Sequence, residues 1–346
     1  MPETMKAAIY KEGSNRLSVE EYPVPEISNN ELLVQVIACG ACHTDLHYLD
    51  HGVSTFKKPP LILGHEASGI VVKSLSKKFK TGDRVLIPST FSCGKCDFCN
   101  SNRNNICRNM IMPGNHIDGA FAQYIKVPDS EIILLPDEIP LEEACIIADA
   151  LSTPYHAVFN RAKVLPNNRV LVIGCGGVGI NVVKFSALAG AEVIACDINE
   201  DKLRIAADMG AKYTVNTDNT PLKDFLNNSG DYVDIAFEVI GKPETIEAAF
   251  KSLKPAGKLC IIGYTNKNIN INPAKIMFYE QEIIGSIGCP ASEYPKIIEF
   301  VLQGKIKLSS LINNKYPLEL INKAFDELRE SKVLRNIILP NGRFVK

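Results

Sequence analysis

The stretch that most constrains the fold of this chain is a glycine-rich turn between two short apolar runs, residues 169–197. A β-branched run at 170–173 leads into the turn GCGGVG at 174–179. Apolar residues at helical spacing follow, and a second apolar run, 193–196, ends at Asp197. Strand, tight turn, helix, strand and a final acid in this order are typical of a dinucleotide-binding βαβ unit. The stretch therefore predicts an α/β fold with a doubly wound parallel sheet.

Each part of this unit has a physical role in holding a dinucleotide. One glycine forms the turn, another lets the pyrophosphate approach bare backbone, and the third lets helix and strand pack closely. Free N–H groups and the helix dipole favour the phosphates. Asp197 can accept hydrogen bonds from the adenosine ribose and would repel a 2′-phosphate, which predicts NAD. The residues expected to bind the cofactor here are Gly174, Gly176, Gly177, Val178, Gly179 and Asp197. The alternative is a glycine-rich βα connection without a ligand.

The composition limits the class of protein. The chain has 346 residues, enough for two domains, and its formal net charge is −1. So small a charge gives no general attraction to nucleic acid or anionic membranes. No apolar run spans a bilayer, and the first residues lack the apolar core of a signal peptide, so we expect a cytoplasmic protein. Its eleven cysteines are expected to be reduced thiols and metal ligands rather than disulfides.

Hydrophobic periodicity divides the chain into two domains. Short alternating apolar runs over 5–40 and again over 119–136 predict a mostly antiparallel β domain, followed by one helix over 141–160. Beyond Asp197, strands expected at 212–215, 232–237, 257–262 and 282–287 alternate with helices expected at 200–209, 243–253 and 291–303. The last forty residues predict strand, helix, strand and leave this rhythm, so we assign them to the β domain. The expected domains are 1–152 with 291–346, and 153–290.

Four cysteines with the spacing C-x2-C-x2-C-x7-C lie between residues 93 and 107. Four thiolates this close can bind one Zn²⁺ tetrahedrally, and the small or polar residues between them could not fold on a core of their own. An iron–sulfur cluster is disfavoured, because the ferredoxin pattern has a last gap of three residues followed by proline. Unliganded thiols are the other alternative. A site with four protein ligands has no open position, so it would be structural. Its ligands are Cys93, Cys96, Cys99 and Cys107.

A catalytic zinc needs three protein ligands and an exchangeable fourth position. The candidates outside the cysteine segment are Cys42, His65, Glu66 and Asp149. Spacing alone does not bring them together, and a hydrogen-bonded core histidine is an equal alternative for His65. Asp149 lies in the apolar stretch CIIADALST, where an unpaired carboxylate would be costly. A metal or another cation must compensate that charge.

Taken together, these motifs resemble the zinc-dependent medium-chain alcohol dehydrogenases over essentially the whole chain. The resemblance depends on CGACHTDLH (39–47), GHEASG (64–69), TGDRV (81–85), the four cysteines, and GCGGVG with Asp197, in the family's order. It implies a GroES-like β-rich catalytic domain joined to a Rossmann domain. It also implies that the zinc and the cofactor converge in the cleft between the two domains.

The resemblance further implies how the catalytic zinc is held. Cys42 and His65 would bind it, and Glu66 would be the carboxylate that enters the metal's shell when the substrate position is vacant. Members of the family commonly have cysteine as the third ligand, where this chain has Asp149. Some members do carry aspartate there, so Asp149 is kept as a ligand. A hard oxygen ligand in place of thiolate should make the zinc a stronger Lewis acid.

The same resemblance implies a proton relay and contacts to the cofactor. Thr44 and His47 would carry the proton from the alcohol, and Asp45 would orient His65. His43 and Arg335 would contact the cofactor pyrophosphate, although a solvated charge is an equal alternative for Arg335. His116 and His156, with the cysteines in apolar runs, are expected to be structural.

The predicted activity is that of an NAD-dependent zinc alcohol dehydrogenase, which interconverts a primary or secondary alcohol with an aldehyde or ketone. A cyclic hydroxyacyl-CoA or a polyol is an alternative substrate, and ADALSTPYHAV (148–158) resembles dehydrogenases of cyclic hydroxyacyl thioesters. Zinc-independent reductases of the superfamily lack Cys42, His65 and the cysteine segment. A zinc- and dinucleotide-binding protein without catalysis is the alternative from another class, and Thr44 and His47 argue against it.

Partners other than a small-molecule substrate are not expected. A nucleic-acid site on the cysteine segment is disfavoured, because the segment has few positive charges and little aromatic surface. Its basic residues are Lys95, Arg103 and Arg108, its acid is Asp97, and Phe98 is its sole aromatic residue. The resemblance implies a homotetramer, with a homodimer as the alternative. Two zinc ions per chain and NAD are the expected cofactors.

Overall fold

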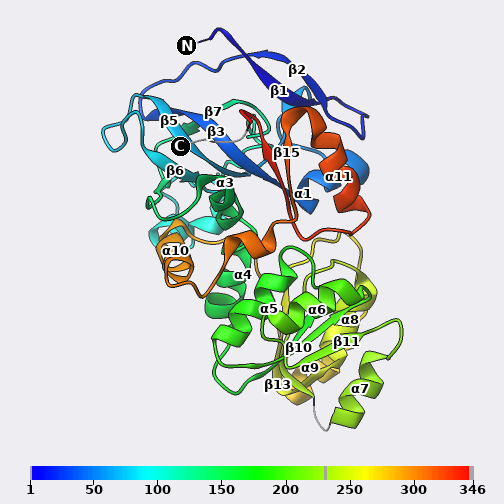
Figure 1. The fold of residues 1–346 in the computed structure, drawn as a ribbon. Coiled ribbons are helices and arrows are strands. Elements are labelled where there is room, and N and C mark those ends of the chain that lie inside the picture. Colours follow the sequence, from blue (N-terminus) through cyan, green and yellow to red (C-terminus); the bar gives the residue numbers. More distant parts are fainter. Residues whose placement is uncertain (1, 230–231, 343–346) are drawn as a thin grey trace. The chain divides into compact units, whose positions relative to one another are not determined.

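The structure is a computed structural model that describes residues 2–229 and 232–342, and it forms two compact units (Figure 1). The first unit contains residues up to Ser152 and from Cys289 onward, and the second runs from Thr153 to Gly288. Within the described residues, none of the helices is both long and apolar enough to cross a membrane.

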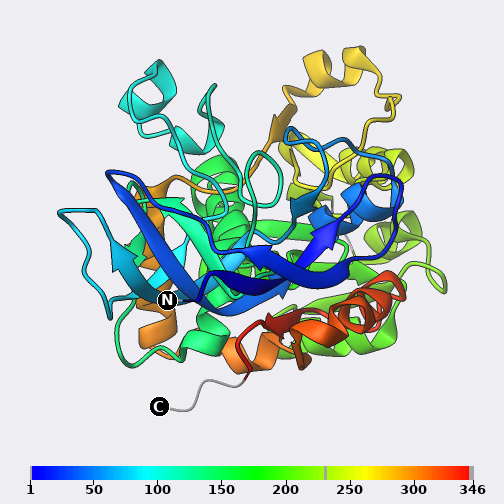
Figure 2. The same cartoon turned by 90° about the horizontal axis from the view of Figure 1, so that it is seen from above.

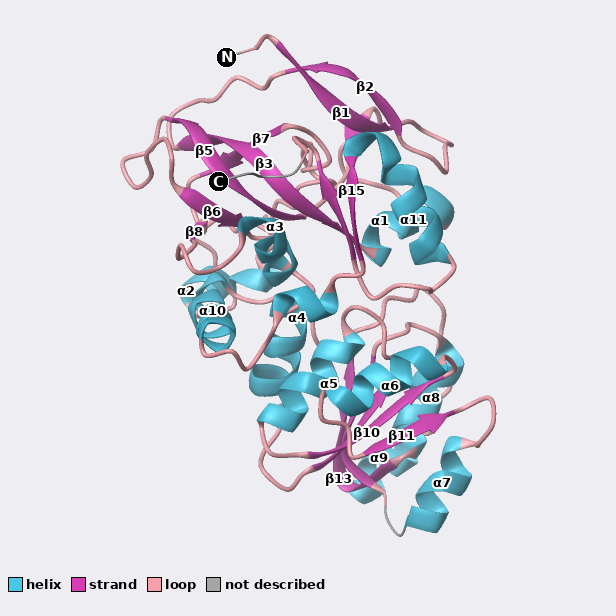
Figure 3. Cartoon of the chain, in the orientation of Figure 1, coloured by secondary structure: helices cyan, strands magenta, loops and turns pink. Residues whose placement is uncertain are grey.

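The first unit is built mostly from β-strands, which form two sheets (Figure 3). A three-stranded antiparallel sheet has the order β2-β1-β4, and a seven-stranded sheet has the order β15-β16-β3-β5-β6-β8, with β7 also paired to β3. The strands are β1 (Thr4–Tyr10), β2 (Ser18–Pro23), β3 (Glu31–Ala41), β4 (Leu61–Ile62), β5 (Glu66–Ser74), β6 (Arg84–Ile87), β7 (Tyr124–Pro128), β8 (Ile133–Leu134), β15 (Asn314–Pro317) and β16 (Asn336–Leu339).

Strand β3 organises the larger sheet. Its sequence ELLVQVIACGA is apolar on both faces, and nine of its eleven residues are buried. It pairs antiparallel with β5, with β7 and, at its end, with β16. The pairing with β16 brings the last part of the chain back beside Ala41, where the first candidate ligand, Cys42, follows.

The helices of this unit are short. They are α1 (His43–Asp50), α2 (Asp97–Asn100), α3 (Leu141–Ala144), α10 (Tyr294–Leu302) and α11 (Ile321–Arg329), with α4 (Ser152–Tyr155) at the boundary between the units. Phe325 of α11 meets Phe121 edge-to-face with the ring centroids 5.7 Å apart, which fixes α11 on the core. The predicted strand, helix and strand in the last forty residues are therefore present.

The single helix predicted over 141–160 is wrong. The segment is α3, then a 3-10 turn over Cys145–Ala148, then α4, then a π-helical segment over His156–Ala162. Asp149 interrupts the run with φ −141° and ψ −52°, which are not helical angles. Pro154 also lacks the N–H that a continuous helix would need. Apolar spacing alone could not reveal this break, because nearly every residue of 144–158 is buried and no face of the segment stands out.

The second unit is an all-parallel sheet of six strands in the order β11-β10-β9-β12-β13-β14. The strands are β9 (Arg169–Ile173), β10 (Glu192–Asp197), β11 (Tyr213–Asn216), β12 (Val233–Glu238), β13 (Leu253–Ile261) and β14 (Glu282–Gly285). The chain winds outward from β9 in both directions, which is the order of a doubly wound dinucleotide-binding sheet. The predicted fold is thus confirmed for this unit.

Helices α5 (Gly179–Leu188) and α6 (Glu200–Asp208) pack against β9, β10 and β11, and α8 (Pro243–Lys251) packs against β12 and β13. Right-handed crossovers on both sides of β9 place these two sets on opposite faces of the sheet. Two helices were not predicted, α7 (Leu222–Ser229) and α9 (Pro273–Tyr279). No residue of α9 is fully buried, and Ile276 alone of this helix packs against the core, so the sequence has no apolar stripe that could reveal it.

Candidate functional site

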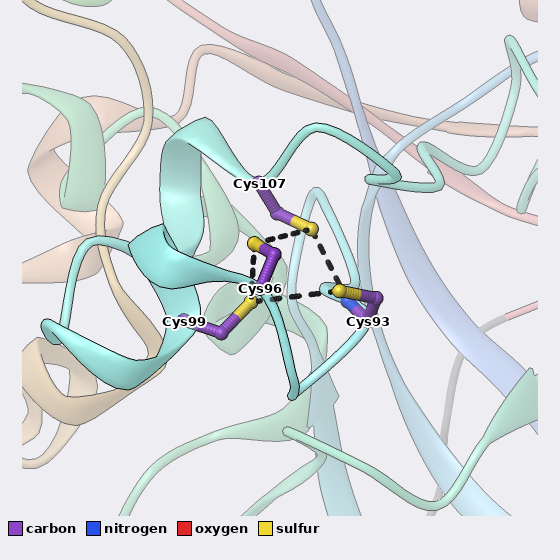
Figure 4. A group of neighbouring side chains, drawn as sticks. All are labelled: Cys93, Cys96, Cys99 and Cys107. Carbon is purple, nitrogen blue, oxygen red and sulfur yellow. Dashed lines mark hydrogen bonds between the residues drawn. The ribbon is translucent and has the colours of Figure 1, made fainter.

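The four cysteines between residues 93 and 107 converge around one point (Figure 4). The Sγ–Sγ distances are 3.4 Å for Cys96–Cys99, 3.8 Å for Cys96–Cys107 and 3.9 Å for Cys93–Cys99. Four sulfurs about 2.3 Å from one Zn²⁺ in a tetrahedron would lie about 3.8 Å apart. Hydrogen bonding from the backbone of Cys99 outweighs burial and lowers the pKa of Cys96 to about 6, which favours the thiolate. The residues present therefore fit a structural zinc.

A glutamate that sequence reasoning missed ties this segment to the sheet. Glu131 accepts hydrogen bonds from Ser92 N at 2.6 Å and Ser92 Oγ at 2.8 Å, just before the first cysteine. It also accepts one from Asn104 Nδ2, before the last cysteine. Figure 2 shows this segment (cyan) standing out from the strands of its unit, so such an anchor is needed. A polar side chain 24 residues from the last ligand leaves no local signal.

The second cluster joins Cys42, His65, Glu66 and Asp149, whose ligand atoms all lie within 4.8 Å of one another. Cys42 follows β3 and is the N-cap of α1, whereas Glu66 begins β5 and His65 precedes it. Gly64, before His65, has φ +97°, a conformation that favours glycine. Asp149 Oδ2 lies 3.8 Å from Cys42 Sγ and 3.9 Å from His65 Nε2. The fold thus brings together four residues whose spacing in the sequence could not pair them.

The environment of His65 favours a cation at this cluster. Its imidazole is buried, and neither ring nitrogen makes a hydrogen bond to any described part of the chain. Asp45 Oδ1 lies 3.5 Å from Nδ1, while Asp149 lies on the Nε2 side. Burial lowers the pKa of His65, but Asp45 and Cys42 outweigh it and hold that pKa well above its usual value. A thiol, an imidazole with an unused Nε2 and carboxylates are a donor set that suits Zn²⁺.

Arg335 is buried and forms an ion pair with Glu66, with 2.9 Å between Nη1 and Oε1. The same Nη1 donates to the Ala41 carbonyl at 3.0 Å. The solvated charge considered for this residue is therefore wrong, because β16 carries Arg335 into the interior beside β3. Burial raises the pKa of Glu66 in spite of the guanidinium. A Cβ on Gly40 would stand 2.2 Å from Glu66 Oε2, so only glycine there leaves room for this pair.

Two side chains that the sequence did not indicate fix the turn carrying Asp149. Ser152 Oγ donates to the Ala148 carbonyl at 2.9 Å, and Tyr294 Oη donates to the same carbonyl at 2.8 Å. Both residues are buried. Tyr294 begins α10, far along the chain, and its apolar neighbours gave no sign of this role.

Thr44, His47 and His51 follow one another along α1 at spacings of three and four residues, which places them on one side of the helix. Thr44 Oγ1 lies 3.6 Å from Cys42 Sγ. His47 Nδ1 lies 3.0 Å from His51 Nδ1. Burial, and to a smaller extent His51, lower the pKa of His47. His43, at the start of the helix, is exposed.

The glycine turn lies at the carboxyl end of β9, between β10 and β12. Gly174 has φ +96°, and a Cβ on Gly179 would meet the Gly174 carbonyl oxygen at 1.8 Å, so the start of α5 packs directly on the turn. A Cβ on Gly176 would meet open space. Asp197 accepts hydrogen bonds from Cys175 N at 2.7 Å, Ile198 N at 2.8 Å and Asn199 N at 3.0 Å. The acid is thereby fixed beside the turn.

Glu238, at the end of β12, is a buried residue that sequence reasoning missed. It accepts hydrogen bonds from Ile240 N at 3.0 Å, Gly241 N at 2.9 Å and Thr245 Oγ1 at 2.7 Å. These hydrogen bonds hold Ile240 against Gly174. A Cβ added to Gly174 would stand 2.6 Å from the Ile240 side chain. The acid at the end of the apolar run YVDIAFE was the available signal.

Comparisons with known proteins give the family. A model described as alcohol dehydrogenase GroES-like domain matches residues 28–137, and one described as zinc-binding dehydrogenase matches residues 177–303. Sorbitol dehydrogenase of Bacillus subtilis (strain 168) is 34% identical over 354 residues, covering 99% of each chain. The chain belongs to the zinc-dependent medium-chain alcohol dehydrogenases. The predicted family and its GroES-like and Rossmann parts are thereby confirmed.

Other members show the same architecture. An alcohol dehydrogenase of Geobacillus stearothermophilus is 32% identical over 341 residues, covering 97% of this chain and 98% of that protein. The crystal structure of an NAD-dependent alcohol dehydrogenase matches with a TM-score of 0.89 and 28% identity, covering 97% of this chain and 99% of that one. A protein of Sinorhizobium meliloti 1021, assigned to the zinc-binding dehydrogenases and bound to NADP, matches with a TM-score of 0.88 and 28% identity. The match covers 98% of this chain and 100% of that one.

The two glycines of the turn should respond differently to alanine. Gly179→Ala drives a methyl group into the Gly174 carbonyl, so it should lower the melting temperature of the protein by several degrees, as a change costing about 2 kcal/mol would. Gly176→Ala has free space and should melt as the wild type does, yet weaken NADH binding measured by fluorescence titration. Equal melting temperatures for the two variants would contradict the packing argument, and unchanged NADH affinity of Gly176→Ala would contradict its contact with the dinucleotide.

Proposed function

We propose that the protein is an NAD(H)-dependent alcohol dehydrogenase that uses zinc to interconvert a primary or secondary alcohol with the corresponding aldehyde or ketone. The observation that carries this proposal is the buried cluster of Cys42, His65, Glu66 and Asp149, in which His65 keeps an unused ring nitrogen. It occurs in a chain of this family that also has a complete glycine turn with Asp197.

Cys42, His65 and Asp149 would hold the catalytic zinc, and Glu66 would be a fourth carboxylate close to it. Zn²⁺ bound there would lower the pKa of an alcohol hydroxyl, and the nicotinamide would accept the electron pair of the carbinol C–H bond. Asp45 would orient His65 from its Nδ1 side. Arg335 would offset part of the cost of burying the Glu66 carboxylate through their ion pair. Cys93, Cys96, Cys99 and Cys107 would hold a second, structural zinc.

Thr44 and His47 would move the proton. Thr44 Oγ1 lies beside Cys42 Sγ, so its hydroxyl is placed to accept a proton from an alcohol at the metal while it passes its own proton on toward His47. His47 lies one helical turn further along α1, and its lowered pKa keeps it neutral and able to accept a proton near pH 7. His43 and Arg335 are proposed as contacts to the cofactor pyrophosphate. For Arg335 this requires the guanidinium to bind the pyrophosphate while it stays paired with Glu66.

We propose NAD rather than NADP because of Asp197. Its carboxylate is fixed at the end of β10, where it can accept hydrogen bonds from ribose hydroxyls but would repel a 2′-phosphate. One structural relative was crystallised with NADP, so membership of the family does not decide between the cofactors. The choice rests on this residue.

A polyol is the second candidate substrate, and it is favoured by the 34% identity to a sorbitol dehydrogenase. A cyclic hydroxyacyl-CoA stays a prediction from sequence, as do the homotetramer with its homodimer alternative and the cytoplasmic location. The test of the function is absorbance at 340 nm with NAD⁺ and a panel of simple alcohols, polyols and hydroxyacyl thioesters. Zinc-dependent reduction of NAD⁺ that a chelator abolishes supports the proposal, and no reduction with any alcohol refutes it.

Asp149→Ala should remove the catalytic zinc, because the remaining cysteine and histidine form an incomplete set. We expect the zinc content measured by atomic emission to fall by about one ion per chain and kcat to fall by about 10³-fold or more. Asp149→Cys restores a ligand and should keep the metal. The surface control Asp137→Ala removes an exposed carboxylate of the same unit and should change neither quantity. An unchanged zinc content in Asp149→Ala would rule out Asp149 as a zinc ligand.

Asp197→Ala should relax the preference for NAD. Like charges in contact cost several kcal/mol, so the ratio of kcat/KM for NADP⁺ to that for NAD⁺ should rise at least about ten-fold. The matched control is Asp208→Ala, which removes an exposed carboxylate at the end of α6. If the ratio is the same in Asp197→Ala as in this control, the role assigned to Asp197 is wrong.

A further inference from the structure

We propose that His51 extends the proton relay by one step, taking the proton from His47 and releasing it to solvent, so that α1 carries a chain of two histidines. The inference rests on the proposed function, in which His47 receives a proton from the alcohol. It assigns a role to an exposed histidine that the sequence motif does not include.

The geometry that carries this proposal is the direct contact between the two rings. Their Nδ1 atoms lie 3.0 Å apart, within hydrogen-bonding distance, and the ring centroids are 5.2 Å apart. One of the two nitrogens must carry a proton, because two lone pairs at this distance would repel. Since His51 lies four residues after His47, the helix itself brings the rings to one side. His47 is half-buried and His51 is exposed, so the pair leads from the interior to the surface.

The proton transfer balances without any further reactant. His47 starts with its proton on Nδ1 and His51 with its proton on Nε2. When Nε2 of His47 gains a proton, its Nδ1–H bond breaks and an Nδ1–H bond forms on His51. The charged ring of His51 then loses its Nε2 proton to water, which restores the starting charge. The starting tautomers return when both rings rotate or exchange protons with solvent.

His51 lies at the end of α1 where the helix dipole is negative. It is the C-cap of α1, and its backbone N–H donates to the His47 carbonyl at 3.3 Å, so the imidazole lies at the negative end of the helix dipole. The neighbouring charges on α1 and α11 are already paired. Asp50 accepts from Arg329 at 2.8 Å, and Asp326 is paired with Arg329 and Arg16. Asp45, on the other side of α1, faces His65.

The first experiment compares the wild type, His51→Gln and the control His116→Gln. His116 is a partly buried histidine that stacks on Phe56 and accepts a hydrogen bond from Met112 N, away from the pair. In weak buffer we expect His51→Gln to lose about three- to ten-fold in kcat for alcohol oxidation near pH 7, and to recover when imidazole is added at high concentration. His116→Gln should show neither effect. A merely structural loss would not respond to imidazole.

The second experiment begins with a titration that needs no turnover, zinc or cofactor, and it is then compared with the pH profile of kcat. The six histidines are few enough for ¹⁵N-imidazole NMR titration of the labelled protein. Because the charge of His51 lowers the pKa of His47, His51→Gln should raise that pKa, and the acid limb of the kcat profile should move to higher pH by the same amount. An unchanged His47 titration, together with a kcat that is equal to wild type and insensitive to imidazole, would overturn the proposal.

The two proposals fail in different ways. If the wild type fails to reduce NAD⁺ with every alcohol tested, the proposed function is wrong, whatever the histidines do in the NMR titration. If the wild type is active but His51→Gln matches His116→Gln in rate, in imidazole response and in the His47 titration, the relay ends at His47. The wild-type spectrum adds a further check, because a hydrogen-bonded pair should show one Nδ1 protonated and the other not.

Discussion

The structure of the first unit depends on how one buried group of charges is balanced. Asp45, Glu66 and Asp149, with the thiol of Cys42, meet around His65 in the interior, and all but Asp149 are shielded from solvent. So many acidic groups cannot stay ionised and buried without positive charge. Arg335 supplies one positive charge to Glu66. A metal bound by Cys42, His65 and Asp149 would supply the rest, which explains why the fold tolerates this cluster.

The architecture around the cluster follows from this requirement. β3 and β5 carry Cys42 and Glu66 to the same end of the sheet, and β16 returns along β3 to bring Arg335 beside them. Asp149 comes from a broken helical segment, because a continuous helix would not present the carboxylate in this way. Ser152 and Tyr294 hold the preceding carbonyl of Ala148 and so fix that break. The candidate ligands therefore come from backbone that is held by hydrogen bonds and sheet pairing, which suits a site that must keep its geometry.

The second unit uses backbone rather than side chains for its binding surface. The turn after β9 is shaped by glycines that leave N–H groups accessible, while Asp197 and Glu238 fix the segments on either side through backbone hydrogen bonds. Asp197 thus has a structural role within the turn besides its proposed contact with ribose. Two acids at the ends of the strands that flank β9 hold the glycine turn between them, and only one of them was evident from the sequence.

The sequence by itself determined the features whose signals are local. The glycine turn with its strands and acid, the four-cysteine segment and the alternation of strands and helices can be recognised because each depends on residues a few positions apart. Only the tertiary structure decided what depends on distant residues. It brought Asp149 beside Cys42 and His65, buried Arg335 against Glu66 and broke the helix predicted over 141–160. Strand register and burial set these contacts, and neither is encoded in the spacing of the residues that make them.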